Sequence, residues 1–245
     1  MSARSASSIV LLLPSLFLSG CADTAVLPTP CARPDASIHS DDPQVTVYFG
    51  CGCFWHVQHE FVVEEITKLC RSGSDLTART AYAGGTKTEE GLVCYHNAMG
   101  KADYGQLGHS EVVSMTLPVS AFSSFAKKFW EICPKGVRRD VQDVGGEYRS
   151  VVGLPGGIHS PLMAQLRADA TAKLVAGAGN DADTLGSDTV LVYDTDEFPA
   201  HEAEKYHQFH DDMLDQYGSA YHALRQFAPS TQCPGDHFTG PFFAS

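Results

Sequence analysis

Alternating and continuous apolar runs along the chain predict a set of short strands. Residues 45–49 are apolar, β-branched or aromatic and are followed by Gly50, which is typical of a buried strand. Residues 109–117 place Val113, Met115 and Leu117 on alternating positions, as in a strand with one face in the core. The same reasoning predicts strands over residues 76–82, 148–154 and 189–193.

Apolar residues at helical spacing predict helices between these strands. The first runs from Phe54 to Leu69, and the second begins at about Ser120. A third is expected from the Ser160-Pro161 cap to about residue 175, and a fourth from Pro199 to Met213. Residues 84–108 and 133–147 lack periodicity and are expected to be loops. Strands that alternate with helices favour one α/β domain over residues 45–214, with helices packed on a mixed sheet.

The two ends of the chain differ from this domain. Arg4 precedes an apolar run at residues 9–18 that is too short to span a bilayer, so residues 1–20 are expected to be a secretory signal peptide. Leu18-Ser19-Gly20-Cys21 is typical of a bacterial lipoprotein processing site, and an ordinary signal peptide is the alternative. Export follows from either interpretation. The proline-rich residues 21–44 are expected to form a linker, and residues 215–245 an irregular tail.

Charge and cysteine content narrow the function further. A net charge of -12 argues against nucleic acid as a partner, because phosphate binding needs clustered Lys and Arg. The chain has eight cysteines, and cleavage or lipidation at Cys21 leaves an odd number. At least one thiol therefore stays free or pairs with another molecule.

The segment Gly50-Cys51-Gly52-Cys53-Phe54-Trp55 carries the clearest chemical signal. It places Cys53 at the turn between a buried strand and the first turn of a helix, where free N–H groups and the helix dipole favour a thiolate. Gly50 and Gly52 would let another molecule approach the backbone closely, and the two aromatic residues, expected to be exposed, would form an apolar slot. The alternative is a small cysteine of the core.

Four sequence blocks in order resemble the peptide methionine sulfoxide reductases of the A type, which act on the S epimer. The resemblance covers about residues 45 to 213. The blocks are Gly52-Cys53-Phe54-Trp55; Gly108-His109-Ser110-Glu111-Val112-Val113; Asp143-Val144-Gly145-Gly146-Glu147-Tyr148-Arg149-Ser150; and Glu204-Lys205-Tyr206-His207-Gln208. The resemblance implies a two-layer sandwich with a ferredoxin-like core, no cofactor and no metal, and a monomer.

The resemblance also assigns roles to the matching residues. Cys53 is the nucleophile, and Glu111 is the acid that protonates the sulfoxide oxygen, since a carboxyl in an apolar pocket keeps its proton to higher pH. Tyr148 donates a hydrogen bond to that oxygen. For a second such donor, the loop offers Tyr95 and Tyr104, and the proximity of Tyr104 to Glu111 in the sequence favours Tyr104.

Substrate binding and recycling complete the expected site. Asp143 holds the substrate backbone N–H, while Phe54 and Trp55 grip the methyl group. Attack leaves Cys53 as a sulfenic acid, which a second thiol condenses into a disulfide for reduction by a thioredoxin-like dithiol. The resemblance implies that Cys233 is this second thiol. Cys94 and Cys133, in loops of their own, are the alternatives, because the tail lacks the family's usual tyrosines.

Two other functions compete with this one. Cys51, Cys53, His56, His59 and Glu60 could bind a metal, although no Cys-x-x-Cys pair occurs, and a zinc assay would decide. A disulfide-stapled extracellular binding module would have almost no free thiol, which a thiol titration would reveal. Histidines and acids at 201–212 are better explained as a solvated helix face.

Overall fold

The computed structural model describes residues 26–39, 41–212 and 216–237. The expected signal peptide and Cys21 lie outside these ranges. Within them, no helix is long and apolar enough to cross a membrane.

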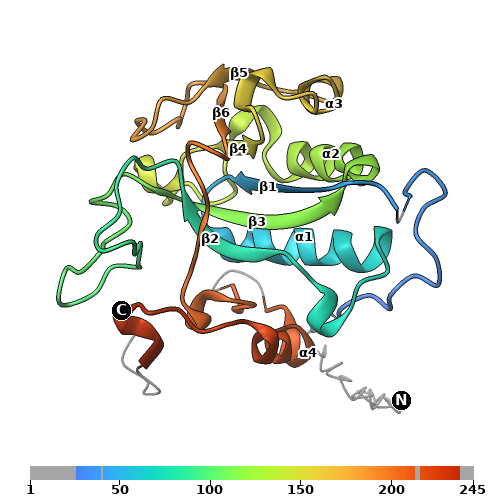
Figure 1. Ribbon diagram of the computed structural model, residues 1–245, viewed down its shortest axis with the longest axis horizontal. Coiled ribbons are helices and arrows are strands. Elements are labelled where there is room, and N and C mark those ends of the chain that lie inside the picture. The colour runs from blue at the N-terminus through green and yellow to red at the C-terminus, as the bar shows by residue number, and fades with distance from the viewer. Residues whose placement is uncertain (1–25, 40, 213–215, 238–245) are drawn as a thin grey trace, which may run out of the picture.

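A seven-stranded mixed sheet forms the centre of the molecule, with the order β5-β6-β4-β1-β3-β2-β7 (Figure 1). Its strands are β1 (Gln44–Gly50), β2 (Arg79–Ala83), β3 (Ser110–Pro118), β4 (Val151–Leu154), β5 (Lys173–Ala176), β6 (Thr189–Asp194) and β7 (His201–Glu202). The four helices are α1 (Phe54–Lys68), α2 (Phe122–Ile132), α3 (Met163–Ala168) and α4 (Gly218–Ala223). The α/β fold predicted from the sequence is confirmed.

Four central strands and two helices form the ferredoxin-like core that the resemblance implied. Strands β4, β1, β3 and β2 are neighbours in that order, and each pair is antiparallel. Helix α1 connects β1 to β2, and α2 connects β3 to β4. Strands β6 and β5 extend this sheet in parallel beyond β4, and β7 adds a short edge beside β2.

One face of the sheet packs against α1 and α2 (Figure 1). Phe49 of β1 stacks on Phe61 of α1 and Phe129 of α2, with ring centroids 4.9 and 5.2 Å apart. Val113, Met115 and Leu117 of β3 join this core, as their alternation predicts. The two helices therefore pack against an aromatic layer. This packing fixes the start of α1, which lies beside the candidate nucleophile.

Buried Arg149 organises the opposite face. Its guanidinium donates 2.9 Å hydrogen bonds to the backbone oxygens of Gly84 and Gly108 and to the hydroxyl of Tyr193. A buried charge is tolerated when its donors are satisfied in this way. Arg149 thereby holds together the two ends of the loop at residues 84–108, which is a loop as expected.

Two of the predicted helices are wrong. The segment expected to be helical from Ser160 to residue 175 has only the short α3 and then forms β5, because pairing with the open edge of β6 outweighs its helix-favouring composition. The segment from Pro199 forms β7 instead of a helix, and Met213 lies outside the described residues. In this segment the Gln208 side chain accepts a hydrogen bond from the Thr80 N–H and donates one to the Thr80 backbone oxygen. These two hydrogen bonds continue the edge of β2.

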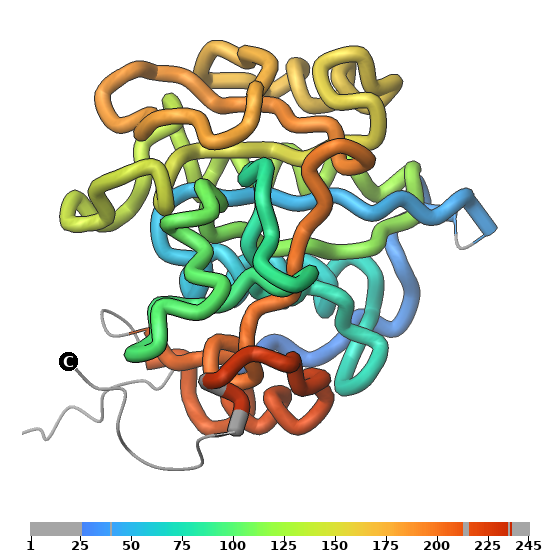
Figure 2. The backbone as a smooth tube through the Cα atoms, turned by 60° about the vertical axis from the view of Figure 1, so that its left-hand side comes forward, coloured from blue at the N-terminus to red at the C-terminus, as the bar shows by residue number. Residues whose placement is uncertain are grey.

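The segments outside the domain are also more ordered than expected. The tail contains α4 and short 3-10 turns, so it is not irregular. In the expected linker, Cys31 is bonded to Cys70, and Leu27 and Ile38 pack against the core. Figure 2 shows the N-terminal segment (blue) returning along the domain and the tail (red) lying near the loop at residues 84–108 (green).

Candidate active site

The register of two strands places Glu111 beside the turn that carries Cys53. Phe49 of β1 pairs with Val113 of β3 in an antiparallel ladder, and continuing this register by two residues brings Cys51 opposite Glu111. The chains can meet so closely because residue 50 is glycine: a Cβ there would lie 2.4 Å from the Glu111 backbone oxygen.

Hydrogen bonds from backbone N–H groups to two carboxyls fix the conformation of this turn. Gly52 adopts a φ of +73°, which favours glycine. The N–H groups of the next two residues lie at the start of α1, where the helix itself offers them no acceptor. Each donates instead to a carboxyl oxygen. Cys53 N–H donates to Asp143 Oδ2, and Phe54 N–H donates to Glu111 Oε2, each at 2.9 Å.

A cavity of about 300 Å³ opens at this turn. It brings together most of the residues singled out in the sequence. Its lining includes Cys53, Phe54, Trp55, Glu111, Asp143, Tyr148, Tyr95, Cys51, His56, Arg139, Asp140, Gln142 and Asp212.

Cys53 is the one free cysteine of the described chain, and it is half-buried. Burial raises the pKa of its thiol well above the usual range, and the carboxyls of Glu111 and Asp143 raise it further. The Trp55 N–H opposes this shift but does not cancel it. The thiolate expected at the helix terminus is therefore disfavoured in the resting protein, because desolvation outweighs the dipole.

Glu111 is buried, as an acid in this setting needs to be. Desolvation raises its pKa to about 8, although the hydrogen bond from Phe54 lowers it. The Tyr104 hydroxyl lies 3.4 Å from Glu111 Oε1 and donates to it. Glu111 is thus mostly protonated at neutral pH and can give up a proton to a molecule in the cavity.

The structure places Tyr95 and Tyr148 in the cavity wall and leaves Tyr104 out of it. Tyr104 is fully buried behind Glu111 and stacks on Tyr95, with ring centroids 5.7 Å apart. Sequence proximity favoured Tyr104, but the loop folds back so that Tyr95 fills the position at the cavity. Burial raises the pKa of both Tyr95 and Tyr148, so their hydroxyls keep their protons.

The aromatic residues after Cys53 form one side of the cavity. Phe54 is buried, contrary to the exposed position expected for it, and Trp55 is partly exposed. Trp55 stacks on His210 with ring centroids 3.9 Å apart, and His207 lies against both aromatic rings. Reasoning from the sequence missed this support, because the histidines were assigned to a solvated helix.

Asp143 has one oxygen engaged by the turn itself, through the Cys53 N–H. The buried guanidinium of Arg138 donates to the Asp143 backbone oxygen and pairs with Asp183. Asp143 thus borders the cavity where the resemblance places a substrate-holding residue, and that role stays a prediction.

The remaining cysteines of the described ranges form three disulfides: Cys31–Cys70, Cys51–Cys133 and Cys94–Cys233. Cys233 is buried and bonded to Cys94, so it holds no thiol next to Cys53 in this state. The recycling role of Cys233 stays a prediction.

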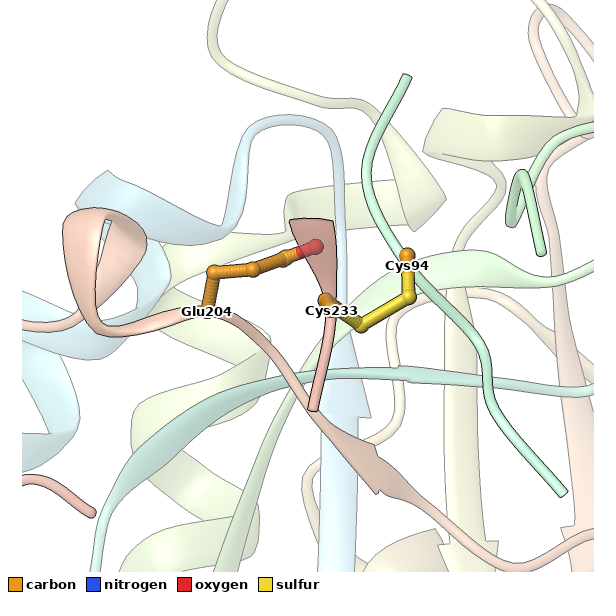
Figure 3. Close-up of side chains that lie close together, drawn as sticks. All are labelled: Cys94, Glu204 and Cys233. Atoms are coloured by element: carbon orange, nitrogen blue, oxygen red, sulfur yellow. A yellow bond between two sulfur atoms is a disulfide. The ribbon is translucent and has the colours of Figure 1, made fainter. Parts of the chain in front are cut away.

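The Cys94–Cys233 bond lies beside the Glu204 carboxylate (Figure 3). Glu204 accepts a hydrogen bond from Tyr95 N–H at 2.8 Å and another from the Tyr82 hydroxyl at 2.9 Å. The disulfide and Glu204 together anchor the loop that carries Tyr95 into the cavity. Sequence reasoning singled out Glu204 only as part of a motif.

Of the two sulfurs weighed from the sequence as metal ligands, Cys51 is bonded to Cys133, whereas Cys53 holds a free thiol. In the described chain, the group of side chains close enough to share an ion is Cys94, Glu204 and Cys233, and its two sulfurs are bonded to each other. The group of Cys94, Glu204 and Cys233 therefore offers no thiolate ligand in this state.

Comparison with known proteins supports the family resemblance. Over 107 residues, or 42% of this chain, the sequence is 32% identical to peptide methionine sulfoxide reductase MsrA of Geobacter sulfurreducens and 31% identical to that of Geobacter metallireducens. The resemblance that the four motifs indicated is confirmed. The match spans 57% of the length of each relative, little more than half. No protein-family model matches the chain.

Among solved structures, methionine sulfoxide reductase A of Corynebacterium diphtheriae aligns with 76% of this chain and 85% of its own, at 18% identity and a TM-score of 0.42. Mxr1 from Saccharomyces cerevisiae in reduced form aligns with 74% of this chain and 89% of its own, at 18% identity and a TM-score of 0.41.

Proposed function

We propose that this protein reduces methionine-S-sulfoxide, free or within proteins, to methionine. The observation that carries the proposal is a free thiol, Cys53, that shares one small cavity with a protonated buried carboxyl, Glu111. Phe54 and Trp55 supply an apolar wall for a methyl group, and Tyr95 and Tyr148 supply hydroxyl donors for an oxygen. Sequence similarity to the two MsrA proteins supports the same reaction, and the S epimer follows from their family's A type.

The two neutral groups account for the proton movements. Glu111 protonates the sulfoxide oxygen, which makes the sulfur electrophilic, and its carboxylate then takes the proton from the Cys53 thiol. The Cys53 sulfur attacks the sulfoxide sulfur while Tyr95 and Tyr148 donate hydrogen bonds to the oxygen. The new sulfur–sulfur bond and the original sulfur–oxygen bond then break as the hydroxyl passes to the Cys53 sulfur, which leaves Cys53 as a sulfenic acid and methionine as the product sulfide. The raised pKa values of Cys53 and Glu111 thus avoid two buried charges at rest.

The oxidised Cys53 must then be returned to the thiol by a dithiol. Two thiols give up two electrons and two protons, water leaves with the oxygen, and a disulfide remains. We propose a thioredoxin-like protein as the donor and a monomer as the active form. We also propose an exported protein that repairs oxidised methionine outside the cytoplasm, on the strength of the apolar run that follows Arg4.

Chiral analysis of a racemic sulfoxide tests the function. With dithiothreitol present, the protein should consume the S epimer of methionine sulfoxide, release methionine and leave the R epimer. Cys53→Ser is the matched control and should release none. Consumption of both epimers alike, or of neither, would refute the proposal. A disulfide-stapled binding module predicts no release at all.

A further inference from the structure

One of the three disulfides is built into the wall of the catalytic cavity. Cys51 lines the cavity together with Cys53, only Gly52 separates them, and Cys51 is bonded to Cys133 at the end of α2. The four cysteines of the other two bonds in the described ranges do not line this cavity.

We propose that Cys51 and Cys133 are the redox-active pair that returns oxidised Cys53 to its thiol. This proposal rests on the proposed function. The structure, with Cys53 free and Cys51–Cys133 bonded, then corresponds to the end of one catalytic cycle.

The steps balance with one external dithiol per turnover. The dithiol first reduces Cys51–Cys133 to two thiols and becomes a disulfide itself. After Cys53 has become a sulfenic acid, the Cys51 thiol attacks its sulfur, and water leaves as the Cys51–Cys53 bond forms. The Cys133 thiolate then attacks Cys51, displaces Cys53 as a thiolate that takes a proton, and restores Cys51–Cys133.

Chain geometry favours this order of attack. Cys51 is the nearest cysteine to Cys53 along the chain, and Gly52 between them tolerates backbone conformations that other residues resist. A disulfide that spans a single residue is strained, and strained disulfides exchange readily. Cys133 therefore has a reactive bond to open. Ser150 Oγ lies 3.6 Å from each of the two sulfurs, so one hydroxyl positions both.

Position at the cavity distinguishes this pair from Cys94–Cys233, since Cys51 lines the cavity while its exposed fraction of 3% is close to the 2% of Cys233. Cys133 is fully buried and Cys51 is 3% exposed, so a reducing thiol meets Cys51 first, through the cavity. Cys94 and Cys233 are also buried, but next to Glu204 and away from the cavity lining. They anchor the loop of Tyr95, which is a structural role.

Disulfide mapping of the unmodified protein tests the proposal. The protein is reduced with a dithiol, freed of it, given one equivalent of methionine-S-sulfoxide, alkylated and analysed by mass spectrometry. We expect Cys51–Cys133 to form in proportion to the methionine released, with Cys53 recovered as a thiol. Formation of Cys94–Cys233 instead, a lasting sulfenic acid at Cys53, or turnover while Cys51–Cys133 stays intact would overturn it. Absence of methionine would refute the proposed function itself.

A trapping variant gives a second readout. In a single turnover without reductant, Cys133→Ser should release about one methionine per enzyme and accumulate a Cys51–Cys53 disulfide, and it should cycle more slowly with thioredoxin, which must then open that bond directly. The double variant Cys31→Ser, Cys70→Ser removes a disulfide distant from the cavity and is the matched control, expected to keep cycling. Equal cycling by Cys133→Ser and the control would overturn the proposal. If Cys133→Ser fails to fold, the mapping of the unmodified protein decides alone.

Discussion

Glu111 and Glu204 are two buried carboxyls with the same kinds of partner. Glu111 accepts hydrogen bonds from the Phe54 N–H and the Tyr104 hydroxyl, while Glu204 accepts them from the Tyr95 N–H and the Tyr82 hydroxyl. Burial raises the pKa of both carboxyls. They differ in what lies in front of them: Glu111 borders the cavity of Cys53, whereas Glu204 lies beside a closed disulfide.

This difference shows that a raised pKa does not by itself make an acid catalyst. A proton can be transferred only where a reacting molecule can come within hydrogen-bond reach of the donor. Glu111 meets that condition through the cavity, and Glu204 serves to hold the Tyr95 loop. Replacing each of the two glutamic acids in turn by glutamine removes its carboxyl proton and should separate the two roles.

The largest difference between the two carboxyls should appear in the chemical step. Glu111→Gln keeps shape and hydrogen bonding but delivers no proton, so single-turnover methionine release should slow by ~10²–10⁴. Glu204→Gln is the matched control and should stay within a few-fold of the unmodified protein. Equal losses in both variants would break the distinction, and a rate within a few-fold for Glu111→Gln would remove Glu111 from the mechanism.

The pH dependence of the same step should follow Glu111. Its folded pKa is raised to about 8, so the acid form prevails below pH 8 and is lost above it. The single-turnover rate should therefore fall about tenfold per pH unit above that point. Glu111→Gln should lose this dependence. A rate that stays level from pH 7 to pH 10 would contradict the assignment.

Removal of the disulfide beside Glu204 should affect stability more than chemistry. The double variant Cys94→Ser, Cys233→Ser frees a long loop, which should lower the free energy of unfolding by ~2–4 kcal/mol. The chemical step should slow by only a few-fold, as Tyr95 loosens. Denaturant unfolding and single-turnover rates measure the two effects. A loss of chemistry as large as that of Glu111→Gln would give this disulfide a catalytic role.

The last effect concerns how the stability of the fold depends on pH. A folded pKa raised from 4.5 to about 8 means that the folded protein holds a proton that the unfolded chain releases. The contribution of Glu111 to the free energy of unfolding is therefore lost as the pH rises from 4.5 to about 8. Above that pH the contribution no longer changes. Glu111→Gln should flatten this part of the profile in melting curves. A profile unchanged by the substitution would contradict a protonated Glu111.

The sequence predicted the core well because its signals are local. The continuous run before Gly50 reflects a strand buried on both faces, the alternation that ends at Leu117 reflects the core face of β3, and both strands formed as predicted. Cys53 and Glu111, which the motifs singled out, line one cavity because adjacent antiparallel strands share a register.

Features that depend on distant partners were missed. Strand β5 exists because the edge of β6 is open, and Gln208 avoids a helix because its amide completes the edge of β2. The choice of Tyr95 over Tyr104 depends on how a long loop folds back, and the disulfide pairing cannot be deduced from the spacing of cysteines. The raised pKa of Cys53 comes first from burial by the folded chain and then from Glu111 and Asp143, which lie 58 and 90 residues further along the sequence.

The most direct test of the central claim is a single-turnover measurement on Cys53. Reduced protein, freed of reductant, is mixed with excess methionine-S-sulfoxide, and the methionine released is counted per enzyme. The unmodified protein should release methionine in a stoichiometric burst that stops when its thiols are exhausted. Cys53→Ser should stay folded and release methionine slower by several orders of magnitude, because a hydroxyl is a far weaker nucleophile. Substantial release by Cys53→Ser, or no burst from the unmodified protein, would contradict the mechanism.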